Sequence, residues 1–99
     1  MQEVPLEARG AIGALSDPFV TKGRLLFRQT PADYDFTWHN APERQLIVCL
    51  DADVEVTVSD GERRVIRAGE IFSAEDVTGR GHISRAVDGK TRRSLFIPY

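Results

Sequence analysis

Hydrophobic and polar residues alternate along short segments over most of the chain after residue 23. Between residues 54 and 59 valine occupies every second position, and the residues between the valines are polar. This two-residue period is typical of a β-strand with one buried face. Asp60 with Gly61, and Asp88 with Gly89, follow two such segments and are typical of tight hairpins. The pattern predicts strands over residues 24–30, 35–39, 45–50, 54–59, 63–67, 70–74, 82–87 and 92–97.

These predicted strands are joined by short connections without a helical crossover, so neighbouring strands are expected to pair antiparallel. A set of short antiparallel strands favours a small jelly-roll barrel, because closure removes most open sheet edges. The predicted fold class is therefore all-β. Residues 1–22 mix glycine and proline with scattered apolar positions, and we expect an irregular or edge-strand leader packed on the barrel. Residues 23–99 then form one domain.

The composition also indicates a single globular domain. The chain has 99 residues, of which 41% are hydrophobic and 28% charged, too few for two cores and too apolar for a disordered chain. Fifteen acidic residues outnumber 13 basic ones, and the formal net charge of -2 argues against a nucleic-acid partner. A domain this small has little stability to spare, so we expect a homodimer.

The sequence carries no sign of export or membrane insertion. Its longest apolar run is about five residues, far shorter than a membrane span, and its first residues lack the features of a signal peptide. Cys49 is the only cysteine, which excludes an intramolecular disulfide. We therefore expect a cytoplasmic protein without membrane contact. Strand parity places Cys49 inside the barrel as a buried, unreactive thiol.

The stretch from residue 39 to residue 52 resembles the first motif of the cupin superfamily, small jelly-roll barrels that often hold one metal ion. The family motif contains two histidines, an acidic residue and a closing glycine. If His39 is the first histidine, Ala41 replaces the second and Gln45 stands at the acidic position. Ala52 then replaces the glycine.

A second alignment makes His39 the second histidine, with Thr37 in place of the first and Glu43 as the acid. We prefer the first alignment, because residues 51–53 are typical of a turn between two strands. Gln45 is then the third candidate ligand of the motif, and Glu43 is the alternative.

Residues 69–82 resemble the second cupin motif. His82 stands at its histidine position and Ala86 at its asparagine position, and residues 75–81 replace the family's Pro-x-Gly stretch with two additional residues. The resemblance covers about residues 23–97. It is to small single-domain cupins whose second motif reads Glu-Asp-x-Thr-Gly-x-Gly-His. Cupins range from dioxygenases and isomerases to non-enzymatic binding proteins, so the resemblance does not specify a reaction.

The resemblance implies a site for a divalent transition metal. His39 and His82, the only two histidines of the chain, both fall on ligand positions, and Gln45 or Glu43 would add an oxygen. Neutral imidazole suits iron, manganese, zinc, nickel and copper. Without a metal, His82 and His39 would act as a general acid or base, or as hydrogen-bonded residues of the pocket. The length leaves no room for a separate module that binds an organic cofactor.

Two functions follow from this sequence. The first is a cupin barrel that binds a small organic ligand, with or without a metal, and for which oxygenase- or isomerase-type activity is one option. The second is a non-catalytic ligand-binding or interaction module with a degraded metal site, which Ala41 and Ala86 favour. Eleven of the 13 basic residues are arginine, and one at the barrel mouth, such as Arg80, would hold an acidic substrate. The expectation for these arginines, Arg80 included, is nevertheless an ordinary surface ion pair.

Overall fold

The computed structural model describes residues 2–33, 42–58, 61–75, 81–87 and 89–99, and this part of the chain consists mainly of strands. The strands are β1 (Gln2–Glu3), β2 (Glu7–Ala8), β3 (Ala14–Leu15), β4 (Leu26–Thr30), β5 (Gln45–Cys49), β6 (Val54–Val58), β7 (Arg63–Ile66), β8 (Ile71–Ala74), β9 (His82–Ala86) and β10 (Arg92–Pro98). A single turn of 3-10 helix, η1 (Gly10–Ile12), is the helical element of these ranges. No described helix is long and apolar enough to cross a membrane.

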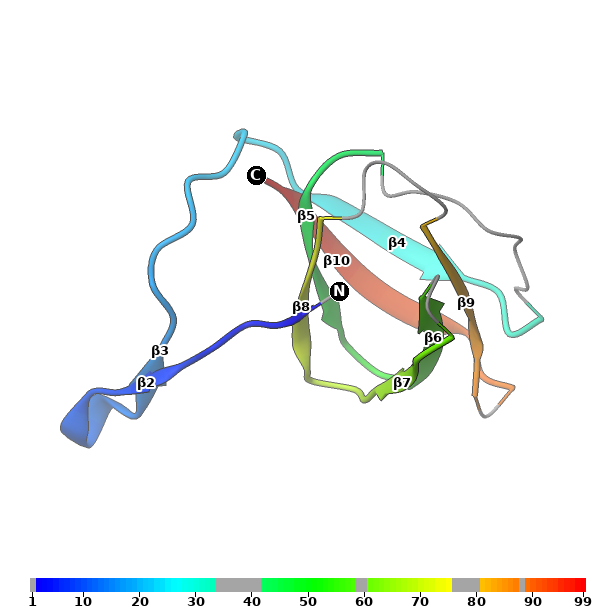
Figure 1. Cartoon of the computed structure of the whole chain (residues 1–99), viewed down its shortest axis with the longest axis horizontal. Helices are drawn as coiled ribbons and strands as arrows, with labels where there is room; N and C mark the ends of the chain where they lie inside the picture. Colours follow the sequence, from blue (N-terminus) through cyan, green and yellow to red (C-terminus); the bar gives the residue numbers. More distant parts are fainter. Residues whose placement is uncertain (1, 34–41, 59–60, 76–80, 88) are drawn as a thin grey trace.

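Most of the strands form two antiparallel sheets that face each other (Figure 1). One sheet has the order β1-β8-β5-β10-β4 and the other β7-β6-β9, so the chain passes repeatedly between the two sheets. The predicted all-β, antiparallel class is confirmed. Seven predicted strands match described strands to within two residues at each end, and the eighth, residues 35–39, lies outside the described residues.

The first 22 residues are only partly associated with the sheets. β1 adds an edge strand beside β8, with Gln2 paired to Ser73. β2, η1 and β3 then form a hairpin that extends away from the sheets (Figure 1). The expectation from the sequence is a leader that packs on the barrel. The hairpin differs from that expectation because its apolar side chains, Leu6, Ile12 and Leu15, are exposed and supply no packing against the sheets.

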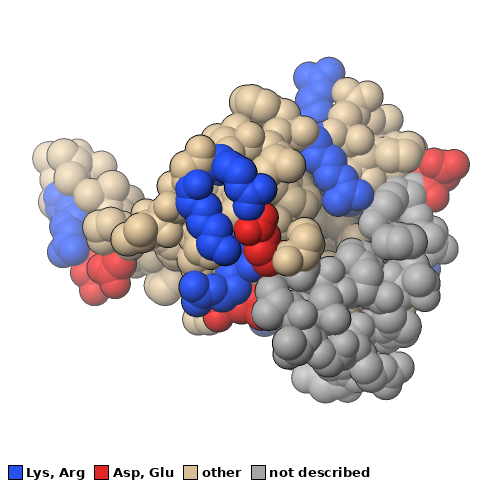
Figure 2. Space-filling model, turned by 90° about the horizontal axis from the view of Figure 1, so that it is seen from above, with Lys and Arg blue, Asp and Glu red and all other residues tan. Residues whose placement is uncertain are grey.

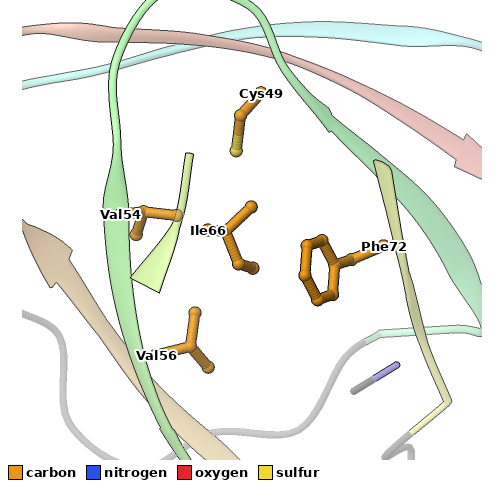
Figure 3. Packing of buried hydrophobic residues seen from close by; sticks show 5 residues of the cluster. All are labelled: Cys49, Val54, Val56, Ile66 and Phe72. Atoms are coloured by element: carbon orange, nitrogen blue, oxygen red, sulfur yellow. The ribbon is translucent and has the colours of Figure 1, made fainter. Parts of the chain in front are cut away.

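The core lies between the two sheets and draws on both of them (Figure 3). Its side chains point toward one another and belong to Cys49, Val54, Val56, Ile66 and Phe72. Alternate residues of β6 face this cluster, as the valine pattern predicted. Between the inward valines, Glu55 faces outward and accepts a hydrogen bond from Arg85 of the neighbouring strand β9, 3.1 Å away.

Acidic side chains tie the connections at one end of the sheets to neighbouring strands. Asp51 Oδ1 accepts the backbone N–H of Arg93 at 2.8 Å, and Asp53 Oδ1 accepts that of Ala68 at 2.9 Å. Gly69 follows in a left-handed conformation with φ of +87°, which a side chain would strain. The connection between β5 and β6 is therefore anchored to the start of β10 and to the turn between β7 and β8.

Replacing Ile66 by alanine is expected to lower the free energy of unfolding by about 2–5 kcal/mol, because a buried side chain is lost and a cavity remains. Ile66 is 1% exposed, whereas Val65, its neighbour on the outer face of β7, is 38% exposed. Val65→Ala is therefore the matched control and should cost about 1 kcal/mol or less. Urea unfolding followed by circular dichroism measures both losses.

Ile66→Val, with an expected cost of about 0.5–1.5 kcal/mol, keeps the comparison measurable should the alanine variant fail to fold. Equal losses for Ile66→Ala and Val65→Ala would contradict the assignment of Ile66 to the core.

Candidate ligand-binding cavity

A cavity of about 440 Å³ lies between the two sheets. Its lining comes from β4, β5, β6, β7, β9 and β10 and from residues that precede β4 and β5. Ligand pockets in proteins have volumes of roughly 300–1,000 Å³, so this space is large enough for a small organic molecule.

β10 organises one wall of the cavity, because it is paired with β5 on one side and with β4 on the other. The residues of β10 that line the cavity alternate along the strand and are Arg92, Ser94, Phe96 and Pro98. In the register of the sheet, Ser94 lies between Cys49 of β5 and Arg28 of β4. Arg92 lies opposite Thr30, one inward position farther from the end of the chain.

The cavity has polar groups at opposite ends. β5 and β9 both start at the end shown uppermost in Figure 1, where Gln45 is paired with Pro98 and His82 with Val58. β10 starts at the opposite end, and its first residue is Arg92. His82 and Arg92 are only 8% and 6% exposed, so both line the cavity as buried polar side chains.

The middle of the cavity is apolar. Val54 and Val56 of β6, Ile66 of β7 and Cys49 of β5 belong to the core cluster and also line the cavity. Ser84 of β9 lies between the two ends and is paired with Val56. A molecule in this space would therefore contact polar groups at its ends and aliphatic side chains between them.

Glu43 lies at the His82 end of the lining and is held by two basic residues. Its carboxylate accepts hydrogen bonds from Arg24 Nη2 and, at 3.4 Å, from Lys22 Nζ. The hydrogen bond from Arg24, supported by the nearby charges of Arg24 and Lys22, holds the pKa of the Glu43 carboxyl below its usual value. Seen from above, basic side chains gather around acidic ones on this face of the molecule (Figure 2).

Cys49 occupies the inward position that strand parity predicted, and the prediction that it is buried is confirmed. Burial raises the pKa of its thiol, and the nearby charge of Arg92 opposes that effect only in part. A raised pKa keeps the thiol protonated at neutral pH, and the protonated form is a poor nucleophile.

The structure brings three of the four predicted site residues, Glu43, Gln45 and His82, to the lining of one cavity. The fourth, His39, lies outside the described residues, as does Arg80. Whether these residues bind or react stays a prediction.

The described residues do not by themselves make a metal site. No group of three or more histidine, cysteine, aspartate or glutamate side chains comes together in this part of the chain. His82 supplies one imidazole and Gln45 a neutral amide, while Glu43 is already bonded to Arg24 and Lys22. The predicted metal site therefore depends on a contribution from His39.

Arg92 and Arg28 are lining residues that the sequence pattern does not indicate. The expectation that Arg92 forms an ordinary surface pair is wrong, because Arg92 is buried and faces the cavity. The alternation of inward and outward residues along β10 would identify Arg92 as a lining residue only if the sequence showed which side of the strand is buried. Leu95, Phe96 and Ile97 are consecutive apolar residues, so the pattern alone does not decide which side of this strand is buried.

Comparisons with known proteins agree with the fold. No family model matches the chain and no curated protein sequence is similar to it. Among solved structures, protein NMB1881 from Neisseria meningitidis has a TM-score of 0.61 and 19% identity, over 81% of this chain and 79% of that one. A cupin-2 domain containing protein from Shewanella frigidimarina NCIMB 400 has a TM-score of 0.57 and 17% identity, over 81% of this chain and 76% of that one.

These similarities establish a cupin-like fold for this chain. The fold predicted from the two motifs is thereby confirmed. At such low identity the likeness carries no information about the ligand or the chemistry of the cavity.

Labelling of Cys49 by a thiol reagent such as dithionitrobenzoate should be slow in the native protein and fast in urea. The physical reasons are burial and the raised pKa, which reduce both access and the thiolate fraction. Because Cys49 is the only cysteine, the absorbance change reports on this side chain alone. The pH midpoint of native labelling should lie above that of the unfolded chain. Equal rates with and without urea would contradict the buried position.

Proposed function

We propose that this chain is a small-molecule-binding protein whose ligand occupies the cavity between its two sheets. The observation that carries this proposal is a cavity of about 440 Å³ bordered by aliphatic side chains and by buried polar ones. Ligand sites have this composition, with mostly apolar walls and a few polar groups that fix the orientation of the ligand.

The alternative, an interaction module with a degraded site, gives no reason for a cavity at this place. Protein interiors are close-packed, and the few voids that they contain are small. Here Val54, Val56 and Ile66 contribute at once to the core cluster and to the cavity wall. A domain that served only as a scaffold would gain stability by filling such a space with larger side chains.

Acid–base chemistry on a bound ligand is a further prediction for His82. Imidazole exchanges protons near neutral pH, and His82 lines the cavity at the end where β9 begins. His39 is the second predicted acid or base and lies outside the described residues. The homodimer and the cytoplasmic location also stay predictions from size and composition.

The neutral fluorescent probe N-phenyl-1-naphthylamine should bind the wild-type protein saturably, because the cavity offers an apolar surface of sufficient volume. Ser84→Leu places a larger side chain inside the cavity, and about tenfold weaker binding is expected. Ile83→Leu, on the neighbouring residue of β9 that faces the other side of the sheet, is the matched control and should leave binding unchanged.

Fluorescence titration of the three proteins, with their folding checked by circular dichroism, gives the affinities. Equal probe binding by Ser84→Leu and the wild type would contradict a ligand site in this cavity.

The metal hypothesis makes its own prediction. If His39, Gln45 and His82 hold a divalent transition metal, untagged protein purified without chelator should carry close to one metal per chain, and the His39→Ala, His82→Ala double variant should lose it. Elemental analysis by plasma mass spectrometry measures both. The same substoichiometric metal content in the two proteins would rule the metal site out and leave the ligand proposal in place.

A further inference from the structure

Two arginines lie close together on the interior face of the sheet where β4 and β10 pair. Arg28 is directly opposite Ser94, and Arg92 is directly opposite Thr30, two residues along the strands. Arg28 and Arg92 are therefore diagonal neighbours on the two paired strands. The Cα atoms of such neighbours are roughly 7–8 Å apart. Both side chains line the cavity. Two long guanidinium side chains at this spacing can bind the same small anion.

We propose that the ligand of the cavity is a small carboxylic acid with an apolar body, whose carboxylate binds at Arg92 and Arg28. This inference rests on the proposed function, because it names the chemistry of the ligand in the same cavity. Ser94, which is buried between the two arginine positions, adds a hydroxyl donor to the same end.

The charges of the described lining favour an anion. Arg24, Arg28 and Arg92 are positive and Glu43 is negative. Glu43 accepts its hydrogen bonds from Arg24 and Lys22 at the other end of the cavity, so the negative charge is balanced there. Arg28 and Arg92, the other two cations of the lining, lie toward the end where β10 begins, and there the guanidinium groups are the ionic groups that the described lining offers to a ligand.

The arrangement of Arg28 suits a carboxylate. Its guanidinium carbon lies 5.6 Å from the centre of the Phe96 ring, over the face of that ring. A guanidinium over a ring face is attracted by the electrons of the ring, and the N–H groups at its edge are its hydrogen-bond donors. A planar carboxylate binds such an edge through two parallel hydrogen bonds.

The remaining lining selects for an apolar body and against a phosphate. Val54, Val56 and Ile66 form the aliphatic middle of the cavity and would contact the hydrocarbon part of an acid. Phosphate groups are typically bound by the backbone N–H groups of glycine-rich loops and helix N-termini. The described lining around Arg92 consists instead of strand residues.

Matched probes test this proposal directly. 3-Phenylpropionate and 3-phenylpropionamide have the same shape, and only the first carries a charge. Titration calorimetry at pH 7 and low salt should give about tenfold tighter binding of the carboxylate to the wild-type protein. Acetate, which lacks the apolar body, should bind about tenfold more weakly than 3-phenylpropionate. The preference should persist in a chelator, which excludes a bound metal as the partner of the carboxylate.

The arginines are tested with two variants and a neighbouring control. Arg92→Gln and Arg28→Gln should each remove most of the preference for the carboxylate, so that the acid and the amide bind with similar affinities. Arg93→Gln changes the adjacent residue of β10, which pairs with Asp51 on the outside, and should retain the preference. If Arg92→Gln fails to fold, Arg28→Gln decides the question, since Arg28 lies on an edge strand and is exposed.

The outcomes separate this inference from the proposed function. Equal affinity for the acid and the amide would overturn the carboxylate assignment while ligand binding stands. Tighter binding of phenyl phosphate than of 3-phenylpropionate would assign the arginines to phosphate and overturn it as well. Failure of the acid, the amide and N-phenyl-1-naphthylamine to bind would contradict the proposed function itself.

Discussion

The backbone pairing of β10 is the constraint on which the rest of the structure depends. β10 is hydrogen-bonded to β5 on one side and to β4 on the other, so its register is fixed twice. A shift by one residue would turn every side chain of the strand to the opposite face of the sheet. Arg92 and Ser94 would then leave the interior, and Arg93 and Leu95 would enter it. The shape and polarity of the cavity are thus consequences of this register.

A buried arginine at the start of β10 carries a cost in stability. Moving a cation out of water is unfavourable unless other groups compensate, and hydrophobic residues of similar volume are often equally stabilising or better. The described core cluster comprises only Cys49, Val54, Val56, Ile66 and Phe72, so the domain has few apolar contacts with which to offset that cost. Arg92 does interact with other groups of the chain, and those groups have to supply the rest of the compensation.

The sequence predicted the strands well where alternation is strong and less well where it is not. β6 has valine at every second position, and its inward face followed at once from the pattern. β10 contains three consecutive apolar residues, so its extent was predicted but its inward face was not. The hairpin of β2 and β3 was missed because each strand has two residues, too few for any period to be visible. The local sequence pattern therefore predicts where the strands are. Which residues line the cavity depends on the pairing between strands that are distant in the sequence.

The same distinction explains why the family motif indicated only one end of the cavity. Gln45 and His82 begin β5 and β9, and the cupin motifs place their ligands at such positions. Arg92 and Arg28 belong to β10 and β4, whose residues the motifs do not include, and they reach the cavity only through long-range pairing. The fold is shared with proteins that are 17–19% identical to this chain, whereas the placement of the arginine pair follows from the strand register of this chain. On the proposal that a carboxylic acid binds here, its acidic end would lie at Arg92 and its other end would point toward His82, so the two groups of residues would make separate contributions to binding.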